Sequence, residues 1–289
     1  MLITTIITGV MLGGLYAMLG IGLSLIYGIM KIVNIAIGSL TILAAYLIMY
    51  FSTALLGGNL AFSFVITLLI MVALGFLIQH FLVNRVAGKS DDAPLLLTFG
   101  LSVIIENTLN SAFSSNVRGI SNPLASVNLV SNEYLSVSAS YALILALAVA
   151  FVVSLSLFIN KTRFGRAMRA TSQNSKVSEL LGVDTRYVFT LVMCISMAII
   201  CVSGLLVGQT FAFTPYTGSS YLAIAMGVVI IGGMGSLVGT LLGGIALGLA
   251  QLLGGYIFGA GHQIFIGYAV MLVLLCLRPQ GIIASMERK

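Results

Sequence analysis

Glu106 is the residue whose type and position most clearly suggest chemistry. It lies in the apolar run "TFGLSVIIENTLNSAF", which has no other charged side chain, and Asn107 and Asn110 follow it. Glu106 and Asn110 share a helical face because they stand four residues apart. A carboxylate in such a run is costly, so it is by default functional, as the lining of a translocation path or as a proton or ion relay. The alternative is a structural carboxyl group, protonated or hydrogen-bonded to a neighbouring helix.

Other polar side chains in apolar surroundings are weaker candidates for the same path: Asn34, Ser39, Thr41 and Gln209. No arrangement typical of catalysis accompanies them. His80 and His262 are isolated, and the sequence has no HExxH, no GxSxG and no glycine-rich GxxxxGK loop for nucleotide phosphates. We therefore predict a protein that is not an enzyme and that carries no metal and no cofactor. Any energy from ATP must come from another chain.

The composition indicates the class of protein to which these polar residues belong. Only 7% of the 289 residues are charged, and mean hydropathy is +1.16, whereas a soluble domain carries about 25% charged residues. So few charges cannot cover a water-facing surface, so the chain is a polytopic membrane protein. At about 20 residues for each spanning helix, it has room for about eight to ten spans. We expect one transmembrane domain over residues 1–289.

Hydropathy predicts an all-α membrane helix bundle. The predicted spans are 3–27, 36–52, 60–83, 95–113, 139–159, 187–209, 219–233, 236–256 and 262–277. In this frame Glu106 lies about 18 Å into its span, past mid-depth. Two glycine-interrupted stretches, 28–38 and 219–233, predict broken or re-entrant helices, which membranes tolerate where irregular backbone lines a cavity. The loop 114–137 is rich in turn-forming residues.

Basic residues predict the orientation. Those on one side of the predicted bundle are Lys31, Arg85, Lys89, the cluster from Lys161 to Arg186, Arg278, Arg288 and Lys289. Only Arg118 falls on the other side. The crowded side is cytoplasmic by the positive-inside rule. The N-terminus is then outside, the C-terminus is cytoplasmic, and no nucleic-acid partner is needed to explain the positive charge.

Small residues recur at helical spacing in "GMGSLVGTLLGGIALGLAQ". Its glycines are Gly235, Gly239, Gly243, Gly244 and Gly248. We place the first three on one helical stripe, which lets helix backbones approach closely within lipid. Packing within the chain and a dimer interface with a second membrane chain both remain open.

The polar loop between the fifth and sixth predicted spans contains a short amphipathic helix. Ser172 or Asn174 can cap its N-terminus, and Gly182 stands where a glycine ends a helix. Val177, Leu180 and Leu181 form an apolar stripe outside the bilayer. That stripe needs a cover, and both an anionic membrane surface and a groove on a partner protein fit.

Five ordered passages give the chain a family resemblance. "RAMRATSQNSKVSELLGVDTRYVF" resembles the coupling loop of ABC-importer permeases of the branched-chain amino-acid type, whose pattern is R-A-x-x-x-(N/D)-x-x-x-A-x-x-L-G-(I/V). "LYAMLGIGLSLIYGIMKIVNIAIGSL", "TFGLSVIIENTL", "GVVIIGGMGSLVGTLLGGIALGL" and "LRPQGII" resemble other passages of that family. Together they extend over most of the chain.

The resemblance implies a permease subunit of an ATP-driven importer in a bacterial cytoplasmic membrane. Implied partners are a second permease chain (identical or related), two ATPase subunits that hold ATP and Mg²⁺, and an extracytoplasmic binding protein. The helix at 170–183 would dock into the ATPase, and membrane lipid would surround the spans. The implied contact residues are Arg169, Ala170, Asn174, Val177, Glu179, Leu180, Leu181 and Gly182.

Two departures from the family pattern leave the cargo open. Ile37 and Ser39 stand where the family has His and an acid, and Glu106 stands where many members carry Gln. Branched-chain or other amino acids, urea, short amides, nucleosides and sugars all remain candidate cargoes. The rival functions are a secondary transporter that uses Glu106 as a proton or ion relay, and a channel-like membrane scaffold.

Overall fold

The computed structural model describes residues 2–55, 58–86, 92–121, 128–132, 135–278 and 281–283. Lys89, Arg288 and Lys289 lie outside these ranges. The helices are α1 (Leu2–Met30), α2 (Ile37–Tyr50), α3 (Leu60–Leu77), α4 (Asn84–Val86), α5 (Ala93–Phe113), α6 (Ala139–Lys161), α7 (Arg163–Gln173), α8 (Ser175–Leu180), α9 (Thr185–Thr210), α10 (Gly218–Gly232), α11 (Leu237–Phe258) and α12 (Gln263–Leu277). Two π-helical segments (Phe51–Leu55 and Ile78–Val83) and two 3₁₀ turns (Pro215–Thr217 and Ala260–His262) adjoin them.

Within the described residues, nine helical segments are long and apolar enough to cross a membrane. They are Leu2–Met30, Ile37–Ala54, Leu60–Val86, Ala93–Phe113, Ala139–Lys161, Thr185–Thr210, Pro215–Gly232, Leu237–Phe258 and Ala260–Leu277. Each matches one predicted span, and the largest difference at an end is that between 219 and Pro215. Helices satisfy their backbone hydrogen bonds internally, which is the condition for crossing lipid. The all-α membrane bundle is confirmed.

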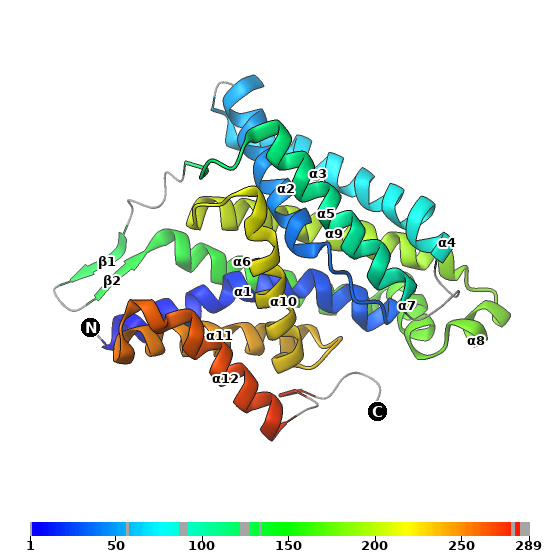
Figure 1. Cartoon of the computed structure of the whole chain (residues 1–289). Coiled ribbons are helices and arrows are strands. Elements are labelled where there is room, and N and C mark those ends of the chain that lie inside the picture. The colour runs from blue at the N-terminus through cyan, green and yellow to red at the C-terminus, as the bar shows by residue number, and fades with distance from the viewer. Residues whose placement is uncertain are drawn as a thin grey trace. The chain divides into compact units, whose positions relative to one another are not determined.

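One short hairpin departs from the helical pattern. Strands β1 (Asn128–Asn132) and β2 (Leu135–Ser138) pair antiparallel, with Asn132 opposite Leu135. They fall in the stretch 114–137, which the sequence predicted only as a loop. Each strand contains one valine, and β-branched residues of this kind favour extended backbone. Figure 1 shows the hairpin leading directly into α6.

The chain divides into two compact units. Unit 1 comprises residues 1–24, 121–156 and 224–289, and unit 2 comprises residues 25–120 and 157–223. In unit 2, α3 packs along α9, and α2 packs against both α9 and α5 (Figure 1). Gly204 makes the α2–α9 contact close, because a Cβ at this position would lie 2.6 Å from the Thr41 carbonyl oxygen. Helices α2, α5 and α9 carry most of the candidate site.

In unit 1, α11 is the central packing element. A Cβ at Gly244 or at Gly248 would lie 2.5 Å from backbone atoms of Gly13 on α1. Gly239 and Gly243 face the α10 backbone with equally little space for a side chain. These four glycines therefore allow close helix packing within the chain, as small residues do in membrane bundles.

Gly235 is not part of this stripe, and its placement there was wrong. It lies in the turn before α11 with a φ of +87°. A left-handed backbone of this kind favours glycine because it has no Cβ. Gly235 therefore allows the chain to reverse between α10 and α11.

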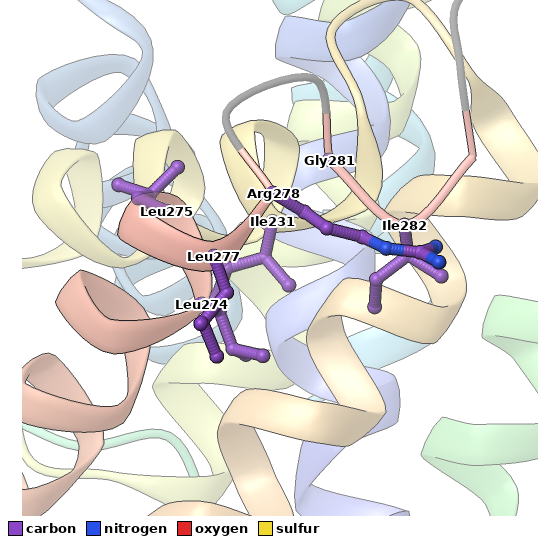
Figure 2. Close-up of a pocket in the computed structure, with 7 residues that line it drawn as sticks. All are labelled: Ile231, Leu274, Leu275, Leu277, Arg278, Gly281 and Ile282. Carbon is purple, nitrogen blue, oxygen red and sulfur yellow. The ribbon is translucent and has the colours of Figure 1, made fainter.

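The C-terminal segment closes the end of α10. The backbone N–H groups of Ile282 and Ile283 donate to the carbonyl oxygens of Ile231 and Gly232, at 2.8 and 3.2 Å. These are the last two carbonyl groups of α10, and carbonyl groups at the end of a helix have no hydrogen-bond partner within it. A cavity of about 210 Å³ lies beside this turn, lined by Ile231, Leu274, Leu275, Leu277, Arg278, Gly281 and Ile282. Figure 2 shows the Arg278 side chain extending away from the leucines of α12.

Candidate functional site

The first element of the site is the non-helical segment between α1 and α2. Lys31 has a left-handed φ of +57°, and residues 31–36 form no helix. The Asn34 side chain accepts a hydrogen bond from the Ala36 N–H at 3.0 Å, and the Ile35 N–H donates to the Thr98 hydroxyl at 3.2 Å. The predicted break near 28–38 is thus an irregular segment fastened to α5. It also sets where α2 begins.

Because α2 begins there, three polar side chains meet. Ser39 Oγ donates to Glu106 Oε1 at 2.8 Å, and Ser39 Oγ lies 2.6 Å from Ser102 Oγ. Ser102 Oγ also lies 3.4 Å from Glu106 Oε1. We call Ser39, Ser102 and Glu106 the hydroxyl–carboxylate cluster. Both serines are buried and Glu106 is half-buried.

The cluster lies deep in a predicted span. Glu106 is about 20 Å along α5 from Ala93, in a helix about 31 Å long. It is the only Asp, Glu, Lys, Arg or His in α2, α5 and α10. Within the part of the chain that the structure describes, Glu106 forms no ion pair and its Oε2 accepts no hydrogen bond. The carboxylate therefore has one occupied oxygen and one that is open to a further donor.

The exposed face of α5 changes character along the helix. Before Glu106 the helix exposes Leu96, Phe99 and Ile104, which are 71%, 55% and 64% exposed. Beyond Glu106 three of the four exposed residues are polar, namely Asn107, Thr108 and Ser111, and the fourth is the small Ala112. Lipid does not accommodate polar groups well, so a face of this kind belongs against protein or a water-filled path.

Two glycines bring the start of α10 against the start of α2. A Cβ at Gly38 would overlap the Gly218 carbonyl oxygen, and one at Gly218 would lie 2.9 Å from Ser39 Cα. Neither position leaves space for a side chain. The predicted short helix at 219–233 therefore begins beside the hydroxyl–carboxylate cluster, where it closes one side of it.

The remaining predicted path residues are not in the cluster. The Thr41 hydroxyl is buried and donates to the Ile37 carbonyl, while Asn107 donates to the Val103 carbonyl of its own helix. Asn110 accepts from the Ser115 hydroxyl at 2.7 Å. Gln209 is half-buried near the end of α9.

Sequence reasoning missed Ser102 and Thr98. Ser102 stands four residues before Glu106, so the helical spacing that paired Glu106 with Asn110 also predicts a shared face with Ser102. Thr98 continues that face by a further four residues. Their signal was therefore present in the sequence.

An aromatic cluster closes unit 2 where α2, α5 and α9 end. The Tyr46 ring lies 4.9 Å from that of Phe113 and 5.0 Å from that of Phe213. Phe213 is held by a two-way backbone pairing with Arg118, at 2.9 and 2.8 Å. The Tyr46 hydroxyl is buried and has no hydrogen-bond partner in the described part of the chain.

A second candidate site is the polar arm, which we define as residues 161–186. The predicted single helix at 170–183 is in fact two helices, α7 and α8, joined at Asn174. Asn174 has extended backbone, and its side chain accepts from the Val177 N–H at 3.1 Å. The side chain thus caps α8, as asparagine does at many helix N-termini. Ser172, the other predicted cap, lies inside α7.

The arm exposes the predicted apolar stripe. Leu180 is 87% exposed, Leu181 is 78% exposed and Val177 is 48% exposed. Gly182 has a φ of +84° and turns the chain after α8. The Glu179 carboxylate accepts from the Thr185 hydroxyl at the start of α9, so α8 is fastened to α9. The exposed stripe therefore lies on a short helix whose position is fixed by its contact with α9.

Arg169 and Ala170 have a different position. Arg169 Nη1 donates to Asn160 Oδ1 at 2.6 Å, and the Ala170 carbonyl accepts from the Asn174 N–H at 3.2 Å. Both are half-buried. They hold the joint between α6, α7 and α8, whereas Leu180 and Leu181 form the exposed surface.

Comparison with known proteins identifies the family. The family described as "Branched-chain amino acid transport system / permease component" matches residues 5–277. The chain belongs to this family. It is therefore a permease component, and with nine apolar helices in its described residues it is a multi-pass membrane protein.

Individual relatives agree over nearly the whole length. The high-affinity branched-chain amino acid transport system permease protein BraD of Pseudomonas aeruginosa is 28% identical over 98% of this chain and 95% of that protein. Permease protein LivH of Escherichia coli is 28% identical over 96% of this chain and 94% of that protein. PsaBC from Streptococcus pneumoniae, solved in complex with Fab, has a similar fold. It has a TM-score of 0.50 and 14% identity, and the match covers 99% of this chain and 92% of that chain.

The family gives both sites a context. A permease component must provide a route for its cargo, and the hydroxyl–carboxylate cluster is a polar site within the spanning helices of unit 2. The polar arm presents an exposed apolar stripe, formed by Val177, Leu180 and Leu181, on a segment that is otherwise polar.

Proposed function

We propose that this chain is the membrane subunit of an ATP-driven importer in a bacterial cytoplasmic membrane, and that its polar arm docks onto the ATPase. The supporting observation is the exposure of Leu180 and Leu181 on a capped and tethered helix outside the spans. Apolar residues at helical spacing typically dock into a hydrophobic groove on a partner. The proposal favours a protein partner over the membrane surface as the cover.

The full assembly has further members. A second permease chain, identical or related, covers the polar face of α5 beyond Glu106. Two ATPase subunits carry ATP and Mg²⁺, and an external binding protein delivers the cargo, an amino acid. The N-terminus is outside and the arm is cytoplasmic, which agrees with the basic residues of the arm and the positive-inside rule.

The contacts of unit 2 give a route for coupling. The arm is fastened to α9 through Glu179 and Thr185, and α9 packs closely on α2 at Gly204. Ser39 of α2 belongs to the hydroxyl–carboxylate cluster. Movement of the arm by the ATPase then shifts α9 and α2 together. The aromatic cluster at the far end of α9 is the gate that this movement opens.

A proton-coupled secondary transporter is the second candidate. One observation favours it: Glu106 is an unpaired carboxylate on a spanning helix within the described residues, and such groups serve as proton relays in transporters. It does not explain the exposed stripe on α8.

Purification of the tagged chain from its native membrane distinguishes these functions. The importer predicts that an ATPase and a second permease chain co-purify with it in stoichiometric amounts. A chain that purifies alone and takes up solute under a proton gradient would establish the secondary transporter. The ATPase should leave the complex when Leu180 and Leu181 are both changed to Asp, while the permease still elutes as a folded protein.

A further inference from the structure

Three helix ends of unit 2 carry aromatic rings that lie close to one another. Phe158 is near the end of α6, Phe164 is in the first turn of α7, and Tyr187 is in the first turn of α9. The Phe164 ring lies 6.1 Å from that of Phe158 and 6.3 Å from that of Tyr187. Helices α6 and α9 are spanning segments, and α7 follows α6 directly. The rings therefore mark the depth at which the chain leaves the bilayer.

Exposed basic side chains border these rings. The four are Lys161, Arg163, Arg166 and Arg186. Arg163 and Arg166 share a face of α7 because they stand three residues apart. Arginine cannot lose its proton in a protein, so the charge of this surface is fixed. Within the part of the chain that the structure describes, none of the four residues forms an ion pair.

No acidic side chain neutralises this surface from the neighbouring elements. Helices α6 and α7 contain no Asp and no Glu. The acidic residues nearest to the start of α9 are already engaged: Glu179 accepts from the Thr185 hydroxyl, and Asp184 accepts from the Tyr187 N–H at 3.1 Å. The surface therefore retains its positive charge and is open to an anion.

The joint between α6 and α7 is held in one geometry. The Thr162 hydroxyl donates to the Phe158 carbonyl at 2.7 Å and accepts from the Gly165 N–H at 2.9 Å. A Cβ at Gly165 would overlap the Ile159 carbonyl oxygen, so α7 lies directly against the end of α6. The backbone that carries Arg163 is thus fixed at the end of the span. A preorganised surface loses less conformational entropy when it binds a ligand.

A phospholipid headgroup with net negative charge is the chemical complement of this surface. Guanidinium groups bind phosphate through two parallel N–H donors. Clusters of four or more basic residues directly beside a spanning helix attract anionic lipid, and tyrosine rings gather at headgroup depth. An acidic groove on a soluble protein would also neutralise the charge, but it would leave the rings at the membrane boundary without a role. Lipid explains both features.

We propose that this surface binds the headgroup of an anionic phospholipid in the leaflet on the side of the polar arm. We call it the headgroup site, and it comprises Lys161, Arg163, Phe164, Arg166, Arg186 and Tyr187. The site shares no residue with the exposed stripe of α8, so it goes beyond the proposed function and does not depend on it. Bound lipid fixes the membrane end of the arm and leaves the stripe for its partner.

Lipid-specific quenching of fluorescence on the full-length chain tests this without any ATPase. The chain has no tryptophan, so Tyr187→Trp introduces a single fluorophore at the site. The variant is reconstituted into vesicles of phosphatidylcholine and phosphatidylglycerol, and one of the two lipids at a time carries brominated acyl chains, which quench tryptophan on contact. We expect phosphatidylglycerol to bind at this position at least threefold more strongly than phosphatidylcholine. A ratio near one overturns the proposal.

Phe81→Trp is the matched probe, because Phe81 is 48% exposed near the end of another span and has fewer basic neighbours. Its ratio should stay close to one. An equal preference for phosphatidylglycerol at both positions would be a general attraction of anionic lipid to a basic chain, and it overturns the proposal.

Arg163→Gln with Arg166→Gln, added to Tyr187→Trp, should lower the ratio to near one. Arg85→Gln with Arg278→Gln is the control, since it removes the same charge from exposed residues elsewhere, and it should leave the ratio unchanged. If the first pair keeps the lipid preference and instead releases the ATPase during co-purification, the surface binds protein and the proposal is overturned.

Native mass spectrometry of the chain without a tryptophan probe decides the matter if Tyr187→Trp does not fold. The unmodified chain should retain phosphatidylglycerol when detergent removes phosphatidylcholine. The variant with Arg163→Gln and Arg166→Gln should lose it, and equal retention by the two chains overturns the proposal.

Discussion

The exposed stripe of α8 gives the sharpest quantitative prediction. Leu180 and Leu181 are 87% and 78% exposed, and the proposed docking into a groove buries both side chains. Leu to Ala removes three carbons, and each buried carbon contributes about 0.8 kcal/mol. The double change Leu180→Ala with Leu181→Ala therefore costs about 5 kcal/mol of docking free energy. That corresponds to roughly a thousandfold or more in the dissociation constant, at 1.4 kcal/mol for each factor of ten.

The measurement is a titration of fluorescent ATPase subunit onto the permease in nanodiscs. The double alanine variant should show the large loss of affinity, while its thermal unfolding stays close to that of wild type, since exposed side chains contribute within about 0.5 kcal/mol. Leu180→Met with Leu181→Met is the matched control, because volume-conserving apolar changes are well tolerated. An alanine variant that binds the ATPase within threefold of wild type would refute the docking argument.

Three further changes test the packing and the caps. Gly248→Leu should lower the unfolding temperature of the purified chain strongly because α1 leaves no space there, whereas Gly261→Ala, which meets no atom within 4 Å, should not; equal temperatures would contradict the α1–α11 packing. Asn174→Ala should destabilise α8 by about 1 kcal/mol because it removes the N-terminal cap. Backbone amides of residues 175–180 should then exchange hydrogen faster than they do in Asn174→Asp, which keeps a capping side chain. Gly218→Val should abolish transport while the chain remains in the membrane, since its side chain would displace Ser39; full transport would show that α10 does not close the cluster.

The spans could be read from the sequence because lipid imposes a simple rule. A spanning segment needs about 20 apolar residues and internal backbone hydrogen bonds, and both leave a strong local signal. The break near Lys31 and the short helix at 219–233 were also visible, because glycine and polar residues interrupt that signal. The hairpin β1–β2 was not, since short strands outside the bilayer have no comparable length or hydropathy.

The candidate site was only partly predictable. Ser39 and Glu106 were each recognised as polar residues in apolar surroundings, but they are 67 residues apart in the chain. Their contact depends on the irregular segment 31–36 and on the closeness of Gly38 and Gly218. Neither follows from local periodicity. Ser102 could have been added from helical spacing alone.

The polar arm shows the same limit. The stripe, the cap at Asn174 and the glycine at 182 follow from local patterns of a few residues. That Asn174 separates two helices, and that Glu179 fastens the second of them to α9, depends on tertiary structure. Gly235 was misplaced because a spacing of four does not reveal a positive φ.

ATP-driven uptake by the purified assembly in sealed proteoliposomes tests the central claim most directly. ATP is supplied on the side of the membrane that carries the ATPase, and the binding protein is supplied on the opposite side. Labelled leucine should then accumulate, and this accumulation should stop when Leu180 and Leu181 are both changed to alanine. Without ATP, a proton gradient should drive none. Uptake that a proton gradient sustains in the absence of the ATPase would contradict the account and establish Glu106 as the relay of a secondary transporter.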